Sequence, residues 1–199
     1  MFHGLQPGML MLSFLAMAVP AHALDIVVDS TLDFAEQDAE AGREDRYTCG
    51  FTSDAIFQPA PNGVCTLRRA VLEAGVRPDD DRPIRILFDL PTSDPNYDPT
   101  LQHWEVQIDS SFVWEIDRRF VTDDGGQITI DGSSQPIGRS DGPRILINTN
   151  ADNNPLGGRS LEVRTAKNVI QNLGLLGGGE IILYDKDNIV QNVSFGDAQ

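Results

Sequence analysis

Short segments in which apolar and polar residues alternate fill the chain from about residue 104 onward. They are separated by Gly, Asn, Asp or Pro and read WEVQI, FVWEI, QITIDG, RILIN, LEV, NVIQNLGLL, EIILYD and NIVQNVSF. Two similar segments come earlier, DIVVDSTL at 25–32 and PIRILFDLP at 83–91. Alternation with a period of two is typical of half-buried β-strands, so the pattern predicts an all-β protein.

One segment, residues 65–75, has a helical period instead. Thr66 can accept the first free backbone N–H groups, and Gly75 can supply the left-handed residue that ends a helix. The side chains expected on the buried face are Leu67, Ala70, Val71 and Ala74. The side chains expected in water are Arg68, Arg69 and Glu73. The pattern therefore predicts one short amphipathic helix.

A repeat of 20 residues relates the last two groups of strands. LEVRTAKNVIQNLGLL, from Leu161, aligns with IILYDKDNIVQNVSFG, from Ile181, at nearly every apolar position. A unit this small becomes stable by stacking on copies of itself, so the repeat favours a parallel β-helix over a sandwich or a barrel. Asn168, Gln171 and Asn172 recur as Asn188, Gln191 and Asn192, and the asparagines predict a ladder of side-chain amides, with Asn168 over Asn188 and Asn172 over Asn192.

The first 23 residues predict an export signal. An apolar run from Met9 to Val19 is followed by Pro20 and the small-x-small triplet at 21–23, so cleavage would leave Leu24 first. The run is shorter than the roughly 20 apolar residues that cross a bilayer. We therefore expect an exported protein, extracellular, at the cell surface or periplasmic, with no membrane span in the mature chain.

The mature chain is strongly acidic and holds two cysteines. No charged side chain lies in residues 1–23, so the formal charge of -15 stays with the exported part and excludes nucleic acid as a partner. In an oxidising compartment, Cys49 and Cys65 predict one disulfide around 15 intervening residues. Such a crosslink stabilises a fold by about 3 kcal/mol.

Three segments resemble known exported proteins. Residues 25–90, which contain NGVCTLRRAVLEAG, resemble the CSLREA-type domain at the N-termini of exported bacterial β-helix proteins. QITIDGSSQP at 127–136 resembles a phrase that follows in those proteins, and NVIQNLGL resembles segments of pectin-lyase-like right-handed β-helices. The resemblance implies a right-handed parallel β-helix whose N-terminal end is capped by the short helix.

The helix departs from that family pattern at Arg69, where the family has Glu. That Glu would complete a capping box with the backbone N–H of Thr66, and Arg69 cannot accept this hydrogen bond. We therefore expect the helix to depend more on the disulfide and on tertiary packing. The predicted organisation is a signal peptide at 1–23, a disulfide-containing capping module at 24–103, and β-helix coils at 104–199 that are open at the C-terminus.

Candidate catalytic chemistry is sparse. The charged residues of the repeat are Glu162, Arg164, Asp185, Lys186 and Asp187. The offset of 20 places Thr165 over Asp185 and Lys167 over Asp187, which pairs no two carboxylates as glycoside hydrolysis requires. We expect a solvated row of charges and no catalytic residue.

Other candidate sites receive similar predictions. His103 is the only histidine of the mature chain, and we expect it in a surface loop. Asp79–Asp81, and Asp123 with Asp124, could hold calcium weakly, but their spacing matches no calcium loop, so solvated turns and no cofactor are expected. Trp104 and Trp114 could stack on a carbohydrate, although packing is the commoner role.

These expectations favour a non-catalytic exported or cell-surface scaffold of adhesin type. Two alternatives stay open. The chain could be the N-terminal part of a carbohydrate-active β-helix enzyme with its catalytic residues beyond Gln199, or a small subunit whose open end docks a partner protein. The paths of residues 92–127 and 148–160 stay undetermined.

Overall fold

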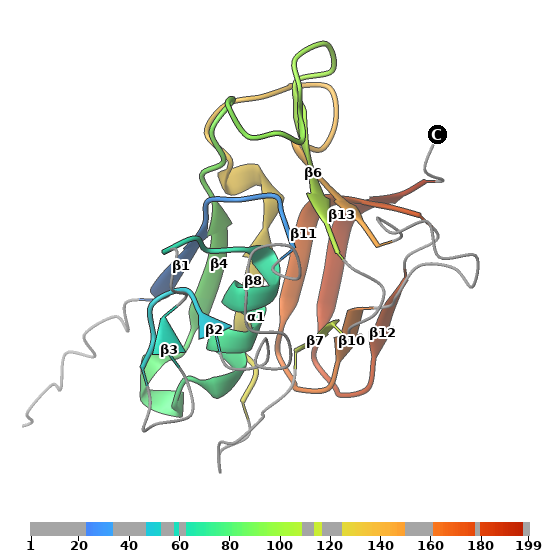
Figure 1. Cartoon of the computed structure of the whole chain (residues 1–199). Coiled ribbons are helices and arrows are strands. Elements are labelled where there is room, and N and C mark those ends of the chain that lie inside the picture. Colours follow the sequence, from blue (N-terminus) through green and yellow to red (C-terminus); the bar gives the residue numbers. More distant parts are fainter. Residues whose placement is uncertain are drawn as a thin grey trace, which may run out of the picture.

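The computed structural model describes residues 23–33, 47–52, 58–59, 63–108, 114–116, 125–149, 161–177 and 180–196 (Figure 1). The export signal, Asp123 and Asp124 therefore lie outside the described residues. Each segment predicted from its alternation contains a strand, so these strand predictions are confirmed. The strands are β1 (Leu24–Val28), β2 (Tyr47–Thr48), β3 (Gln58–Pro59), β4 (Ile84–Phe88), β5 (Tyr97–Asp98), β6 (His103–Gln107), β7 (Trp114–Ile116), β8 (Ile128–Asp131), β9 (Ile145–Asn148), β10 (Leu161–Val163), β11 (Val169–Leu176), β12 (Ile181–Leu183) and β13 (Ile189–Phe195).

The strands form one large sheet and two small ones. The large sheet has eight strands in the order β1-β4-β8-β11-β9-β6-β5, and β13 pairs with β11 beside this path. The second sheet has the order β12-β10-β7, and β2 pairs with β3. All the described pairs are parallel except β5 with β6.

The predicted right-handed parallel β-helix is wrong. The strands make a mixed, mostly parallel sheet that curls into a half-barrel with one described α-helix, not a solenoid of stacked coils (Figure 1). In a solenoid each strand pairs with its equivalent at a constant spacing. Here the first half of β11 pairs with β8 and its second half with β9, and β5 runs antiparallel to β6. Among the described strands, the constant offset of 20 is confined to the last two groups.

Within those two groups the predicted register is confirmed. Leu161 pairs with Ile181 in β10 and β12, and Leu175 pairs with Phe195 in β11 and β13. The backbone repeats as well, since Asn172 has φ 59° and its equivalent Asn192 has φ 51°. Asn tolerates this left-handed conformation better than most residues, so the repeated Asn fixes a bend at the same point of both strands.

Helix α1 (Leu67–Val76) confirms the predicted cap and the predicted apolar face. The hydroxyl of Thr66 accepts a hydrogen bond from the backbone N–H of Arg69 at 3.3 Å. The predicted stop at Gly75 is wrong, because the helix continues to Val76 and ends at Arg77 with φ -70° and ψ 140°. Arg77 precedes Pro78, and the proline ring disfavours helical backbone in the residue before it.

The polar face of α1 is buried, contrary to the prediction of a wet face. Arg68 donates two hydrogen bonds to Asp33 at 2.8 and 2.6 Å, and Arg69 donates to the carbonyl oxygen of Val64 at 2.7 Å. Glu73 accepts hydrogen bonds from the backbone N–H groups of residues 50 and 51 at 2.9 and 3.2 Å. Partners from three separate segments therefore compensate the desolvation of these charges.

The disulfide between Cys49 and Cys65 is confirmed, with the two Cα atoms 4.7 Å apart. It ties the segment after β2 to the residue before the N-cap of α1. Glu73 holds the same segment from the other end of the helix through residues 50 and 51. The segment 49–51 is thus held against α1 both by the disulfide and by hydrogen bonds to Glu73.

A single apolar core joins α1 to the sheet. Figure 1 shows α1 (green) against the sheet, and it contacts β1 and β4. The strands alternate as predicted: Ile84, Ile86 and Phe88 of β4 point into the core and are at most 2 % exposed. The core also contains the apolar side chains of α1 and further side chains from the sheet and its flanking residues, among them Ile26, Val28, Leu90, Trp104, Val106, Ile108, Ile128, Ile130, Ile145, Ile147, Leu161, Val163, Ile170, Leu173 and Leu175.

Candidate functional site

A set of stacked amide side chains follows β11 and β13. This amide ladder consists of Asn168, Gln171 and Asn172 and of their equivalents Asn188, Gln191 and Asn192. The side-chain amide of Asn192 donates to the Asn172 Oδ1 at 2.6 Å, and that of Gln191 donates to the Gln171 Oε1 at 2.6 Å. The structure therefore brings the four predicted ladder residues together in the predicted pairs, and adds the glutamines.

The first step of the ladder is buried and saturated. The Asn168 Oδ1 accepts from the backbone N–H of Ile128 at 3.1 Å, and the Asn168 Nδ2 donates to the Thr165 carbonyl at 2.8 Å. The Asn188 Oδ1 accepts from the backbone N–H and from the side-chain amide of Asn168, both at 2.9 Å. Asn168 therefore links three segments of the chain: the start of β8, the turn before β11 and the turn before β13.

Asp131, at the end of β8, anchors the other two steps. Its carboxylate accepts from the side-chain amides of Asn172 and Gln171, both at 2.8 Å, and from the backbone N–H and hydroxyl of Ser133 at 2.9 and 2.7 Å. Partial burial opposes ionisation, but the hydrogen bonds from Asn172, Ser133 and Gln171 outweigh it and hold the pKa of Asp131 below its ordinary value. A carboxylate occupied in this way is a structural anchor and a poor general base.

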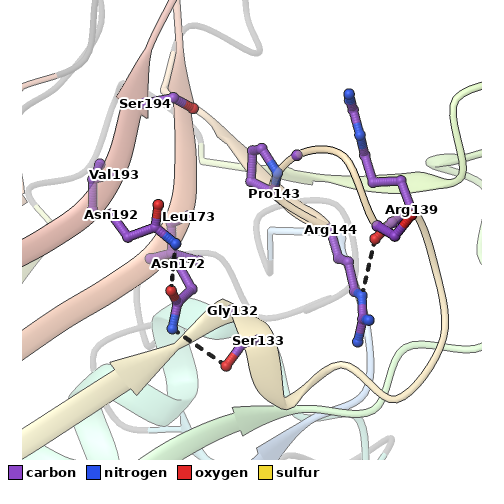
Figure 2. Close-up of a pocket in the computed structure, with 12 residues that line it drawn as sticks. Gly132, Ser133, Arg139, Pro143, Arg144, Asn172, Leu173, Asn192, Val193 and Ser194 are labelled. Atoms are coloured by element: carbon purple, nitrogen blue, oxygen red, sulfur yellow. Dashed lines mark hydrogen bonds between the residues drawn. The ribbon is translucent and has the colours of Figure 1, made fainter.

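A groove of about 520 Å³ lies between the ladder and the loop that leads to β9 (Figure 2). One wall is made by Asn172, Leu173 and residues 192–194 of β11 and β13. The facing wall is made by the loop 139–144, and Gly132 with Ser133 forms the floor. The groove therefore presents side-chain amides and hydroxyls on one side and two arginines on the other.

Both arginines of the groove are engaged by the protein itself. Arg139 pairs with Asp141 at 3.0 Å, and its hydrogen bond and charge lower the pKa of Asp141. Arg144 donates to the carbonyl oxygens of Gln135 and Arg139, at 2.5 and 3.2 Å (Figure 2 shows the latter). These contacts stabilise the loop and engage both guanidinium groups. The groove therefore presents neutral amides and hydroxyls to a ligand more readily than a charged side chain.

A second cleft, of about 730 Å³, contains the charges of the repeat. Its lining residues include Arg164, Lys167, Asp185, Lys186 and Asp187, all of which are exposed. The backbone N–H of Lys167 donates to the carbonyl of Lys186 at 3.3 Å, which stacks the two turns as the offset of 20 predicts. Acids alternate with bases here, and Glu162 outside the cleft pairs with Arg164.

The acidic turn at Asp79–Asp81 is a short 3-10 helix whose side chains form ion pairs. Asp79 pairs with Arg82 at 3.2 Å and Asp81 with Arg77 at 3.1 Å. Within the described ranges, no group of three His, Cys, Asp or Glu side chains could hold a metal ion. No helix in the same part of the chain has the length and apolar character that a membrane crossing needs.

His103 lies in β6 and is buried, so its prediction as a surface-loop residue is wrong. Burial lowers the pKa of its imidazole, against an opposing effect of Asp98. Trp104, the next residue, is fully buried and donates from Nε1 to the Pro91 carbonyl at 3.0 Å, with its ring 4.5 Å from that of Tyr97. Trp104 is therefore a core residue, and the side chain of Trp114 lies outside the described part.

Three apolar residues of the second repeat copy are exposed where their equivalents in the first copy are buried. Val163 is 0 % exposed and Leu183 is 42 % exposed; Ile170 is 2 % and Val190 is 36 %; Leu175 is 3 % and Phe195 is 61 %. Among the described strands, β12 pairs with β10 alone and β13 with β11 alone. We call this surface the open edge and define it by Leu183, Tyr184, Ile189, Val190 and Phe195.

Sequence reasoning missed the residues that surround the ladder. Asp131 and Ser133 carried a signal, because an Asp two residues before a Ser at the end of a strand is typical of a turn closed by the Asp side chain. Arg144 carried none, since its partners are the carbonyl groups of Gln135 and Arg139, which only the folded loop brings near. The disulfide and α1 form a separate group at the start of the sheet.

No family model, no curated protein and no solved structure matches the chain. The function is therefore interpreted from the geometry, and the resemblance to CSLREA-type proteins stays a prediction.

Proposed function

We propose that the protein is an exported, non-catalytic scaffold that binds a partner protein along the open edge. The observation that carries the proposal is the contrast between the two repeat copies. Phe195 occupies in β13 the position that Leu175 occupies in β11, yet it is 61 % exposed where Leu175 is 3 % exposed. Apolar side chains gathered on one surface are typical of an interaction site.

The backbone supports the same conclusion. A strand that pairs on one side presents unpaired N–H and C=O groups on the other, and proteins normally protect such an edge with charge, proline or a covering element. Here β13 carries no charged residue between Ile189 and Phe195. An added strand would satisfy its backbone and bury its side chains, as in other partners that extend a sheet.

Export is part of the proposal. Its support is the apolar run at 9–19 with the small-x-small triplet after it, together with the disulfide of Cys49 and Cys65. The acidic charge of -15 favours a protein partner over nucleic acid or an anionic surface.

A site-specific crosslink tests the proposal. A photo-crosslinking amino acid replaces Tyr184 on the open edge, and in a matched control it replaces Leu101, which is similarly exposed elsewhere. Irradiation of producing cells should give one discrete adduct from position 184, none from position 101, and no adduct once Val190→Lys and Phe195→Lys are introduced. Equal adducts from both positions, or none from either, would show that the open edge binds no partner.

A further inference from the structure

We infer that the occupant of the open edge is a partner segment of two parallel strands with a Gln-Asn pair in the second strand and a basic turn between them. The inference rests on the proposed function and names the chemistry of the partner. It comes from the way in which residues 181–196 themselves bind residues 161–176.

The geometry of the edge requires two strands. Leu183 belongs to β12 in the three-stranded sheet, and Phe195 belongs to β13 in the large sheet. A single strand could pair with one of these sheets but would leave the other exposed. A strand, a short turn and a second strand cover both, as β12 and β13 cover β10 and β11.

The end of the amide ladder specifies polar groups in the second strand. In two steps of the ladder, a side-chain amide of the second repeat copy donates to a side-chain oxygen of the first copy: Asn192 donates to Asn172, and Gln191 donates to Gln171. In the described part of the structure, the Asn192 Oδ1 and the Gln191 Oε1 accept no hydrogen bond. An arriving Gln-Asn pair would donate to both oxygens and continue the ladder without a buried unpaired group.

The start of the ladder specifies a third polar group. The backbone N–H of Asn168 donates to the Asn188 Oδ1, whereas the backbone N–H of Asn188 has no acceptor among the described residues. An Asn three residues before the Gln of the partner would supply that acceptor. These three contacts fix both the direction and the register of the arriving strands.

Charge specifies the turn. The guanidinium of Arg164 lies 4.8 Å from the ring centre of Tyr184, and Lys167 lines the same cleft as Asp185 and Asp187. Thus the basic turn of the inner copy already lies on the outer turn, in which Asp185 and Asp187 flank Lys186 and leave an excess of negative charge. The outer side of Asp185 and Asp187 is exposed, so a basic turn complements it, whereas a second copy of this chain would add its own charge of -15.

The probe for the test is a fluorescently labelled peptide with the sequence of residues 161–176, which has all three features. Fluorescence anisotropy should show saturable binding to the purified protein. Gln171→Glu with Asn172→Asp in the peptide removes the amide donors at nearly constant shape and should weaken binding about tenfold, an effect that persists at high salt. Arg164→Gln with Lys167→Asn should weaken binding less, and mainly at low salt.

Matched variants of the protein locate the binding. Phe195→Lys should abolish it, and Leu101→Lys should leave it unchanged. Since a free peptide loses entropy on ordering, the same segment is also attached to the C-terminus through a flexible linker, which raises its effective concentration. Amide exchange over Ile189–Phe195 should then slow by at least about tenfold.

Three results would overturn the inference. The first is equal binding by the peptide that lacks the amide donors. The second is no binding of the free peptide together with unchanged exchange in the linked chain. The third is self-association of the protein in sedimentation that Phe195→Lys abolishes, which would identify a second copy as the occupant. If any of these occurs while the Tyr184 crosslink persists, the partner chemistry is wrong and the scaffold function stands; if the crosslink also fails, both fall.

Discussion

The two copies of the 20-residue repeat share their sequence pattern and differ in their surroundings. Both have the bend at the second Asn, with φ 59° at Asn172 and 51° at Asn192, and both place amides at the same positions. In the first copy β11 pairs with β8 and β9 on one side and with β13 on the other, whereas in the second copy β13 pairs with β11 alone among the described strands. The comparison shows that burial here depends on the neighbours and not on the alternation itself.

The edge strand β1 also has a neighbouring strand on one side only, but other parts of the chain cover it. β1 pairs with β4 alone in the described structure, yet α1 packs on this end, and the disulfide and Glu73 hold the chain around it. One edge of the sheet is therefore closed by the chain itself, whereas β13 has no second neighbouring strand among the described residues.

The largest expected loss of stability comes from a substitution that compares a buried position of the first repeat copy with its exposed equivalent in the second. Leu175→Ala removes a buried side chain and should lower the free energy of unfolding by about 2 to 5 kcal/mol. Phe195→Ala, at the paired position, should change it by less than about 0.5 kcal/mol in the isolated protein, as surface substitutions usually do. Urea denaturation measures both. Similar losses for the two variants would contradict the interpretation of β13 as an open edge.

A somewhat smaller effect is expected from removing the disulfide beside α1. Replacing both cysteines, Cys49→Ala with Cys65→Ala, should lower the free energy of unfolding by about 3 kcal/mol. Because α1 has no acidic residue in its first turn and has Arg69 in place of a capping Glu, amide exchange at 66–75 should accelerate before exchange in β11. Unchanged protection of 66–75 in this variant would show that packing alone holds the helix.

The smallest effect concerns the anchor of the amide ladder. The pKa of Asp131 is lowered in the folded protein, so its stabilising contribution is complete above the ordinary aspartate pKa of 3.8 and is lost as pH falls through the lower folded value. Between pH 5 and about 3, Asp131→Asn should therefore lose less stability than the parent protein, by under about 1 kcal/mol after allowance for solvent screening. Parallel stability curves for the two proteins would show that the ladder does not depend on this charge.

Part of the candidate site could be predicted because its determinants are local. The offset of 20 identified the pairs Asn168 with Asn188 and Asn172 with Asn192, since parallel strands in register place equal positions side by side. Asp131 could not be predicted as their anchor, because it lies some 40 residues earlier and reaches Asn172 only through the pairing of β8 with β11.

The same distinction holds for the whole molecule. The strands other than β2, β3 and β5, the cap at Thr66, the apolar face of α1, the disulfide and the local register could be predicted from the sequence, because period, capping chemistry and thiol number are properties of short segments. Three features became clear from the folded protein alone: the sheet curls into a half-barrel and not a β-helix, Arg68, Arg69 and Glu73 are buried, and β11 divides its pairing between β8 and β9. These outcomes depend on which distant segments lie side by side, and a local pattern of apolar and polar residues is compatible with more than one such arrangement.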